Sequence, residues 1–205
     1  MRTRHVVHGL AMLLLTSLAA PCFAAAPANE PGSFVSEVAQ KALLSATNAT
    51  LSSAERTRRL GGMLDEDFDV PQIARFVLGR YWQKATDAER QTFTAVFRDF
   101  MVHIYSRRFN QYNGESFRVV GQSPTTETGT IVYTEMNQPA SGQPVKVEWR
   151  VVGSDGYRII DISVAGISMA LVQRDDFLSF LQQNGGDLSS LVRQLQSKTT
   201  ALESK

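Results

Sequence analysis

Acid–base chemistry in this chain would have to rest on very few side chains. Of the three histidines, His5 and His8 lie in a leader that we expect to be removed, so His103 is the only one left. Asp99 precedes His103 by four residues, which would place both side chains on one face of a helix. This resembles a base and the carboxylate that orients it. No motif presents a serine to the pair, so a half-buried structural histidine is the favoured interpretation.

Asp161 is the second residue that could do chemistry. It stands inside the apolar run 159–164, and an aspartate buried in an apolar pocket can act as a general base because burial raises its pKa. The alternative is a structural carboxylate that holds the neighbouring backbone or Arg150. An exported enzyme of the α+β class that uses Asp161 or His103 is therefore one hypothesis for this chain.

Metal and cofactor motifs are not found in the sequence. There is no HExxH motif, and the acidic run 65–67 lacks the glycine and the distal glutamate of a calcium loop. The arginine clusters 56–59 and 107–108 are typical of solvated helix faces, although contact with an anionic membrane or lipid headgroup is the alternative. We predict no catalytic residue, no metal site and no cofactor.

The first 24 residues are predicted to be a signal peptide. Arg2 and Arg4 precede the apolar segment 10–20, and small residues follow at 24–26. Pro21 before Cys22 argues against a lipoprotein. Cleavage would remove the only cysteine, and export without cysteines is typical of the bacterial periplasm. We therefore expect a signal peptide over 1–24 and a single domain over 25–205 in the periplasm.

Charge and size restrict the function further. The chain has 21 basic and 20 acidic residues, and the leader holds two arginines and no acid, so 19 basic and 20 acidic residues remain. This balance provides no electrostatic surface for nucleic acid. About 180 residues are enough for one domain with a substantial core.

Hydrophobic periodicity of 3.6 residues and capping signals predict helices in the first half. Ser52 with Glu55 and Thr86 with Glu89 form capping boxes, and Asp69 is a suitable N-cap. Expected helices lie around 34–43, from 52 onward, over 70–78 and from 86 to 105. The last has a long apolar stripe made of Phe93, Val96, Phe97, Phe100, Met101, Ile104 and Tyr105.

After residue 114 the period changes to two, which indicates strands at 117–120, 130–136, 145–152 and 157–164. Two more helices are expected, one over 177–183 started by Asp175 and Asp176, and one over 188–196 capped by Asp187. This order predicts an α+β fold, with a curved antiparallel sheet of about four strands covered on one face by several helices.

Three segments together resemble the MlaC/toluene-tolerance family of periplasmic phospholipid-binding proteins. They are FDVPQIARFVLGRYWQKAT at 68–86, ERQTFTAVFRDFMVHIY at 89–105, and the stretch 147–191. The resemblance covers about residues 34–195. One departure is the run Val172, Gln173, Arg174, where many members have Asn-Tyr-Arg; in this the chain is more similar to the branch associated with hopanoid biosynthesis.

The resemblance implies a function as well as a fold. It implies an apolar cavity between sheet and helices, and a monomeric shuttle that carries phospholipid between an inner-membrane ABC transporter and an outer-membrane lipoprotein complex. Binding and hand-off would need no covalent chemistry. A hopanoid or another polycyclic lipid is the alternative cargo, and a structural periplasmic adaptor without a cavity is a further alternative.

We expect the cavity wall to come from the apolar stripe of the long helix and from the strands that face it. The residues predicted to contact lipid are Phe97, Phe100, Met101, Ile104, Val147, Trp149, Val151, Ile162 and Ile167.

Overall fold

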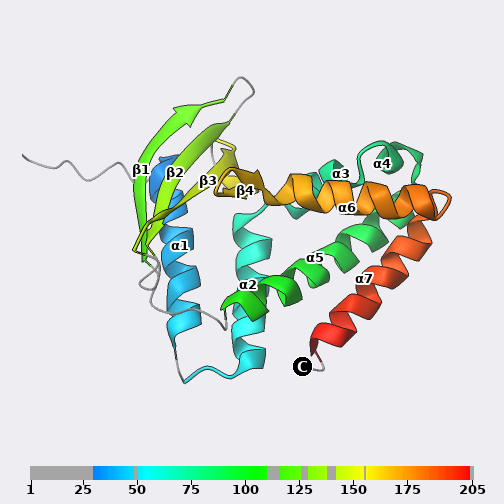
Figure 1. Cartoon of the computed structure of the whole chain (residues 1–205), viewed down its shortest axis with the longest axis horizontal. Coiled ribbons are helices and arrows are strands. Elements are labelled where there is room, and N and C mark those ends of the chain that lie inside the picture. The colour runs from blue at the N-terminus through cyan, green and yellow to red at the C-terminus, as the bar shows by residue number, and fades with distance from the viewer. Residues whose placement is uncertain are drawn as a thin grey trace, which may run out of the picture.

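Seven helices and a five-stranded antiparallel sheet make up the part of the chain that the structure, a computed structural model, describes. The described residues are 30–48, 50–109, 116–125, 129–137, 142–154 and 156–203, so the predicted signal peptide lies outside them. The sheet stands at one end of the molecule and the helices extend away from it (Figure 1). The predicted α+β class is confirmed. No helix in the described ranges combines the length and the apolar character needed to cross a bilayer.

Side-chain caps begin several helices where the sequence predicts them. The Ser52 hydroxyl accepts a hydrogen bond from the Glu55 amide at 3.1 Å, and Asp69 Oδ1 accepts one from the Gln72 amide at 2.9 Å. Thr86 and Glu89 form a reciprocal capping box, because the Glu89 carboxylate also accepts from the Thr86 amide at 2.8 Å. The helices are α1 (Pro31–Thr47), α2 (Ser53–Asp67), α3 (Val70–Leu78), α4 (Arg80–Lys84), α5 (Asp87–Phe109), α6 (Met169–Gln183) and α7 (Leu188–Glu203).

The predicted start of α6 was wrong by eight residues. The helix begins at Met169, capped by the Ser168 hydroxyl, which accepts from the Leu171 amide at 3.1 Å. Asp175 and Asp176 lie inside the helix and are exposed. The expectation failed because these acids resemble a first turn. The exposed Leu171 and Val172 also obscure the apolar period of the true first turn.

The strands form a simple meander, each pairing with the next: β1 (Ser116–Pro124), β2 (Thr130–Asn137), β3 (Val145–Val152), β4 (Arg158–Val164) and β5 (Ile167–Ser168). Register shifts interrupt the β1–β2 and β3–β4 ladders, and such irregularities bend and twist a sheet. Strand β5 was not predicted because two residues carry no period. It follows a two-residue turn in which Ala165 and Gly166 both have positive φ (50° and 81°).

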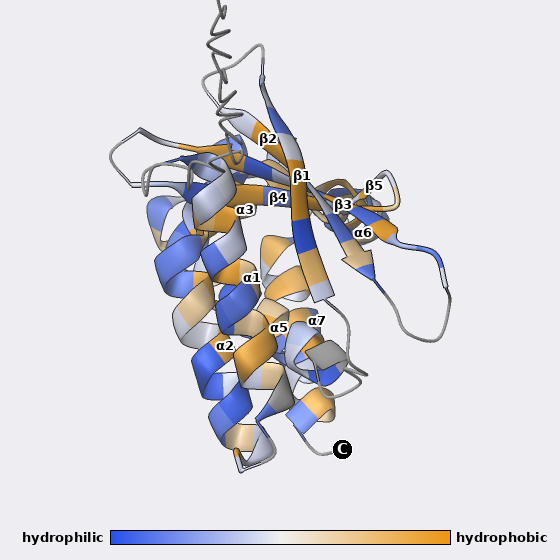
Figure 2. Cartoon of the chain, turned by 90° about the vertical axis from the view of Figure 1, so that its left-hand side faces the viewer, coloured by the Kyte–Doolittle hydropathy of each residue, from blue (hydrophilic) through white to orange (hydrophobic). Residues whose placement is uncertain are grey.

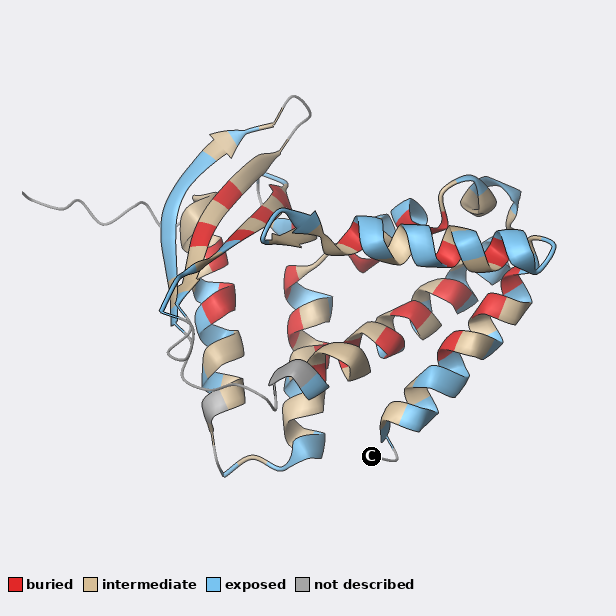
Figure 3. Ribbon diagram, in the orientation of Figure 1, coloured by how far each residue is buried: buried red, intermediate tan, exposed pale blue. Residues whose placement is uncertain are grey.

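Most of the buried apolar residues belong to two groups. Figure 3 shows all buried residues in red, and Figure 2 shows hydrophobic residues in orange. The helical core joins α3, α5, α6 and α7: Val70, Ala74, Val77, Leu78, Phe93, Phe97, Phe100, Phe177, Leu181, Leu188, Leu191 and Leu195. The sheet core joins β2, β3 and β4 to α1 and α2: Val35, Val38, Met63, Val132, Val147, Trp149, Val151 and Ile159.

Phe68, between α2 and α3, packs against both cores. Its backbone forms an isolated parallel bridge with Ile159 of β4, and the next amide, that of Asp69, donates to the Ile159 carbonyl at 3.0 Å. The helical layer is thereby fastened to the sheet through main-chain contacts at this point.

Candidate functional site

An apolar pocket of about 170 Å³ lies where the helical core and the sheet core meet. Five helices and two strands contribute to its wall. The lining residues are Val38 and Ala42 of α1, Leu60, Met63 and Leu64 of α2, Phe68 between α2 and α3, Val70, Ile73 and Val77 of α3, Phe97, Met101, Val102 and Tyr105 of α5, Trp149 of β3, Ile160, Asp161 and Ile162 of β4, and Met169, Ala170 and Gln173 of α6.

Helical geometry explains why two of the helices present apolar side chains here. Val70, Ile73 and Val77 follow one another at i, i+3 and i+7 along α3, so they share one face. On α5, Phe97 and Met101 are four residues apart and share a face in the same way. Two continuous apolar walls result.

Trp149 forms part of the sheet-side wall and is held by buried polar contacts. Its indole Nε1 donates to the Thr134 hydroxyl at 2.9 Å, and that hydroxyl donates to the Val147 carbonyl at 3.0 Å. The ring of Phe117 contacts the indole edge to face, with centroids 6.3 Å apart. Because both its polar and its apolar parts are engaged, the indole has a fixed orientation.

The nine predicted lipid-contact residues lie in four different places. Phe97, Met101, Trp149 and Ile162 line the pocket. Val147 and Val151 are buried in the sheet core beside it, at 4% and 1% exposure. Phe100 and Ile104 lie at another surface of α5, where they line a groove with α6 and α7, and Ile167 is 57% exposed. A lipid-contact role remains a prediction for all nine.

The geometry separates the predicted residues of α5 into two sets. The apolar stripe of α5 is broader than the pocket, so Phe97 and Met101 reach it while Phe100 and Ile104 pack towards α6 and α7. Sequence reasoning missed the walls given by α1, α2, α3 and α6. For α3 the signal was present, since Val70, Ile73 and Val77 already form a one-sided stripe.

Two polar side chains, Asp161 and Gln173, are among the lining residues. One Asp161 oxygen accepts from the Ser168 hydroxyl at 2.5 Å, and the other accepts from the Ala170 amide at 3.0 Å. The carboxylate therefore fastens β4 to the first turn of α6, the structural role that the sequence left open for it. The Gln173 side-chain oxygen is buried and has no hydrogen-bond partner in the described structure.

His103 is engaged on both ring nitrogens away from the pocket. Nδ1 lies 2.8 Å from the Asp99 backbone carbonyl, and Nε2 lies 3.0 Å from the Glu203 carboxylate. The Asp99 carboxylate instead binds Arg98 at 3.0 Å. The hypothetical pair of base and orienting carboxylate is not formed; the imidazole connects α5 to α7.

Asp67, at the end of α2, is buried at 5% exposure. One carboxylate oxygen lies 3.6 Å from the Lys41 ammonium, and the other has no partner in the described structure. Burial raises the pKa of Asp67, and the nearby positive charge of Lys41 opposes this rise. Among the described residues, no group of three or more potential ligands is placed to hold a metal ion.

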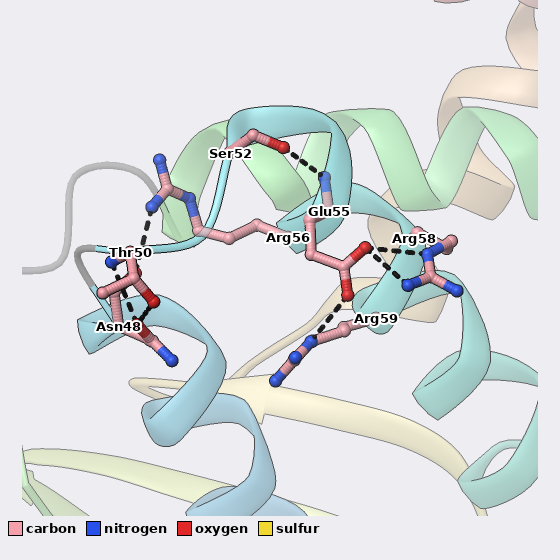
Figure 4. Close-up of polar contacts among 7 residues, drawn as sticks. All are labelled: Asn48, Thr50, Ser52, Glu55, Arg56, Arg58 and Arg59. Atoms are coloured by element: carbon pink, nitrogen blue, oxygen red, sulfur yellow. Dashed lines mark hydrogen bonds and ion pairs between the residues drawn. The ribbon is translucent and has the colours of Figure 1, made fainter.

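The arginine cluster near the start of α2 is engaged within the chain (Figure 4). Arg58 Nε and Arg59 Nε donate to the Glu55 carboxylate at 2.8 and 3.0 Å, and these contacts lower the pKa of Glu55. Arg56 donates to the Asn48 carbonyl at 3.5 Å. These contacts are typical of a solvated helix end, and the Arg58 and Arg59 side chains remain 78% and 49% exposed.

Comparisons with known proteins agree with one another. The model of the family described as "MlaC protein" matches residues 36–197. The toluene tolerance protein ttg2D of Pseudomonas putida is 23% identical over 136 residues, which make up 66% of this chain and 61% of that protein. The match thus spans less than two thirds of the relative's length.

A solved structure has a similar fold. It is the phospholipid-binding protein from Ralstonia solanacearum in complex with a phospholipid, and it superposes with a TM-score of 0.71 at 17% identity, covering 84% of this chain and 98% of that one. At this identity the similarity establishes the fold alone.

Proposed function

The chain belongs to the MlaC family, and on that premise we propose that it is a periplasmic carrier that binds phospholipid in the pocket between its two cores. The observation that carries the proposal is the position of the pocket, at the junction of sheet and helices with an almost wholly apolar wall. A phospholipid bound to a protein of the same fold supports this choice of ligand.

Energetics favour such an apolar site for a lipid. Each methylene moved from water into an apolar environment gains about 0.8 kcal/mol. A sixteen-carbon chain therefore represents roughly 12 kcal/mol, and spontaneous transfer through water is slow. A carrier has to offer a comparable apolar surface and then release the lipid to an acceptor, without bond formation.

The pocket has to widen for this role. Its volume of about 170 Å³ is below the roughly 300–1,000 Å³ typical of small-molecule sites. Since its walls belong to two separate cores, separation of those cores enlarges it while each core keeps its own packing. Binding would therefore proceed with movement of the sheet core, which includes α1 and α2, relative to the helical core.

The family suggests the wider context of this binding step. In our proposal a signal peptide over 1–24 directs the domain over 25–205 to the periplasm. There the monomeric carrier exchanges phospholipid with an inner-membrane ABC transporter and an outer-membrane lipoprotein complex. No residue is assigned a catalytic role.

A pocket-filling variant tests the proposal. Ala170 lines the pocket and is 7% exposed, so Ala170→Phe should occupy part of the cavity, whereas Ala88→Phe adds the same ring to an exposed position on α5. Each mature protein is purified from a Gram-negative periplasm, and its lipid is measured by native mass spectrometry and solvent extraction. We expect stoichiometric phospholipid in the wild type and in Ala88→Phe, and at least about tenfold less in Ala170→Phe. A folded Ala170→Phe protein with full occupancy would contradict the proposed site, and a hopanoid in the wild type would change the cargo.

A further inference from the structure

Gln173, a residue of the pocket wall, has an unused hydrogen-bond acceptor. Its Oε1 atom is buried and receives no hydrogen bond from any described residue. The wall has two other polar side chains, Asp161 and Tyr105. Asp161 uses both oxygens to hold Ser168 and Ala170. Gln173 is thus the lining residue with a free acceptor, in surroundings that are otherwise almost entirely apolar.

An acceptor left in this state is unusual. Roughly 90% or more of buried polar groups in proteins have a partner, and leaving one unpaired costs about 1–3 kcal/mol. A trapped water molecule is a poor substitute, because a buried water typically needs about three polar partners. Apart from Gln173, the wall has only Asp161 and Tyr105 as polar side chains, and both oxygens of Asp161 are already engaged. A leucine of similar size would avoid the cost, so a donor from the cargo is the partner that this position fits.

The neighbouring residues hold this part of α6 in place. Arg174 donates to the Phe76 carbonyl at 2.6 Å, and its guanidinium lies 4.9 Å from the centroid of the Phe76 ring. Gly79 leaves room for this contact, since a Cβ there would lie 3.0 Å from the guanidinium. Together with the Asp161 contacts to the first turn, this fixes α6 on both sides of Gln173. The helix segment that carries the acceptor is therefore held in place before any ligand arrives.

We infer that Gln173 selects a lipid with a hydrogen-bond donor, a hydroxyl or an amide N–H, on the apolar part that enters the pocket. This inference rests on the proposed lipid-binding function and specifies its cargo. A hydroxylated acyl chain and an amide-linked acyl chain share this chemistry. A plain ester-linked acyl chain does not, and it leaves the oxygen unpaired.

The test is a competition measured by native mass spectrometry on delipidated mature protein. The vesicles contain equal amounts of distearoyl phosphatidylcholine, analogues with one hydroxyl at different chain positions, and an amide-linked analogue. Wild type is compared with Gln173→Leu, and Gln182→Leu, which changes an exposed glutamine of the same helix, is the control. We expect wild type and the control to favour at least one donor-bearing lipid by about 5- to 100-fold. Gln173→Leu should bind the plain lipid at least as well and show no preference.

Three results would overturn the inference, and they are distinguishable from one another. Equal binding of all lipids by wild type would remove the selectivity while leaving lipid binding intact. A preference that persists in Gln173→Leu would assign the selectivity to another residue. Absence of any lipid in wild type would overturn the proposed function together with the inference. The hydroxyl and amide arms identify which donor the site accepts.

Discussion

The helical core and the sheet core are filled with different side chains and are held together differently. In the helical core, Phe93 stacks on Phe97 with centroids 5.7 Å apart, and both meet the edge of Phe177 at 6.0 Å. The sheet core is composed largely of valines around Trp149, and it includes the buried hydroxyl of Thr134. The helical core depends on contacts between large aromatic rings. The sheet core depends on strand pairing and on the linked hydrogen bonds of Trp149, Thr134 and Val147. Because the two cores are distinct, the widening of the pocket that the proposed function requires would leave the packing of each core in place.

Truncation of a buried side chain in each core should give the largest losses of stability, and comparing the two losses tests the difference between the cores. Phe93 is fully buried and lies outside the pocket wall, so Phe93→Ala should lower the free energy of unfolding by about 3–5 kcal/mol. Val132→Ala, at an equally buried position of the sheet core, should cost about 2 kcal/mol because fewer atoms are removed. Urea unfolding measures both, and a larger cost for Val132→Ala would contradict the difference between the cores.

The next largest effect is expected from the two linked hydrogen bonds of the sheet core, from Trp149 to Thr134 and from Thr134 to Val147. Thr134→Val removes the acceptor of the Trp149 indole and leaves a buried N–H unpaired, which should cost about 1–3 kcal/mol. In a Trp149→Phe background no indole N–H remains, so the same change should cost clearly less. Unfolding of the four proteins in a double-mutant cycle gives the coupling. Equal costs in both backgrounds would show that this bond does not stabilise the sheet core.

Substitution of Asp67, which lies beside Phe68 at the junction between the cores, is expected to stabilise the folded protein. Burial raises the pKa of Asp67 in the folded protein above its value in the unfolded chain. The stability that this carboxyl group contributes is therefore fully present below the unfolded pKa, and it is lost as the pH rises through the folded pKa. At pH 7, Asp67→Asn should therefore raise the free energy of unfolding, by on the order of 1 kcal/mol. The gain should shrink as the pH falls towards 3.5.

Urea unfolding across this pH range provides the measurement for Asp67. Lys41→Gln is the matched control, since it removes the cation near the carboxylate and should destabilise the protein at pH 7. Asp67→Asn that is less stable than wild type at pH 7 would mean that the Lys41 contact outweighs the cost of burial.

Glu55 lies outside both cores and should have the smallest effect. Arg58 and Arg59 lower its pKa, so their contribution is present above the unfolded pKa and fades as pH falls. The contacts are exposed to solvent, and Glu55→Gln should change Tm by no more than about 1 °C at pH 7. A clearly larger loss in thermal unfolding would indicate that the start of α2 supports one of the cores.

The sequence predicted the elements better than the site, for identifiable physical reasons. Thr86, Asp69 and Ser52 act through hydrogen bonds to residues three positions away, so their capping roles are readable locally. The alternation around Trp149 located β3 in the same way. Local signals also mislead, as Asp175 and Asp176 did for α6.

The pocket could not be located from such local signals. Its wall joins residues from Val38 to Gln173, and their meeting depends on how seven elements pack. Periodicity identified the apolar stripe of α5, but it could not separate Phe97, which reaches the pocket, from Phe100, which packs on Phe177. The free acceptor of Gln173 has no sequence signature at all, because it is defined by the absence of a donor in three dimensions.

The backbone bridge between Phe68 and Ile159 has a consequence for hydrogen exchange. The Asp69 amide, bonded to the Ile159 carbonyl at 3.0 Å, follows a side chain that packs against both cores. Exchange with deuterium at this amide requires the bond to open. Opening only one core leaves the other side of the joint packed, so this proton should exchange at the rate set by unfolding of the entire domain. Its protection factor then reports directly on global stability, with or without lipid.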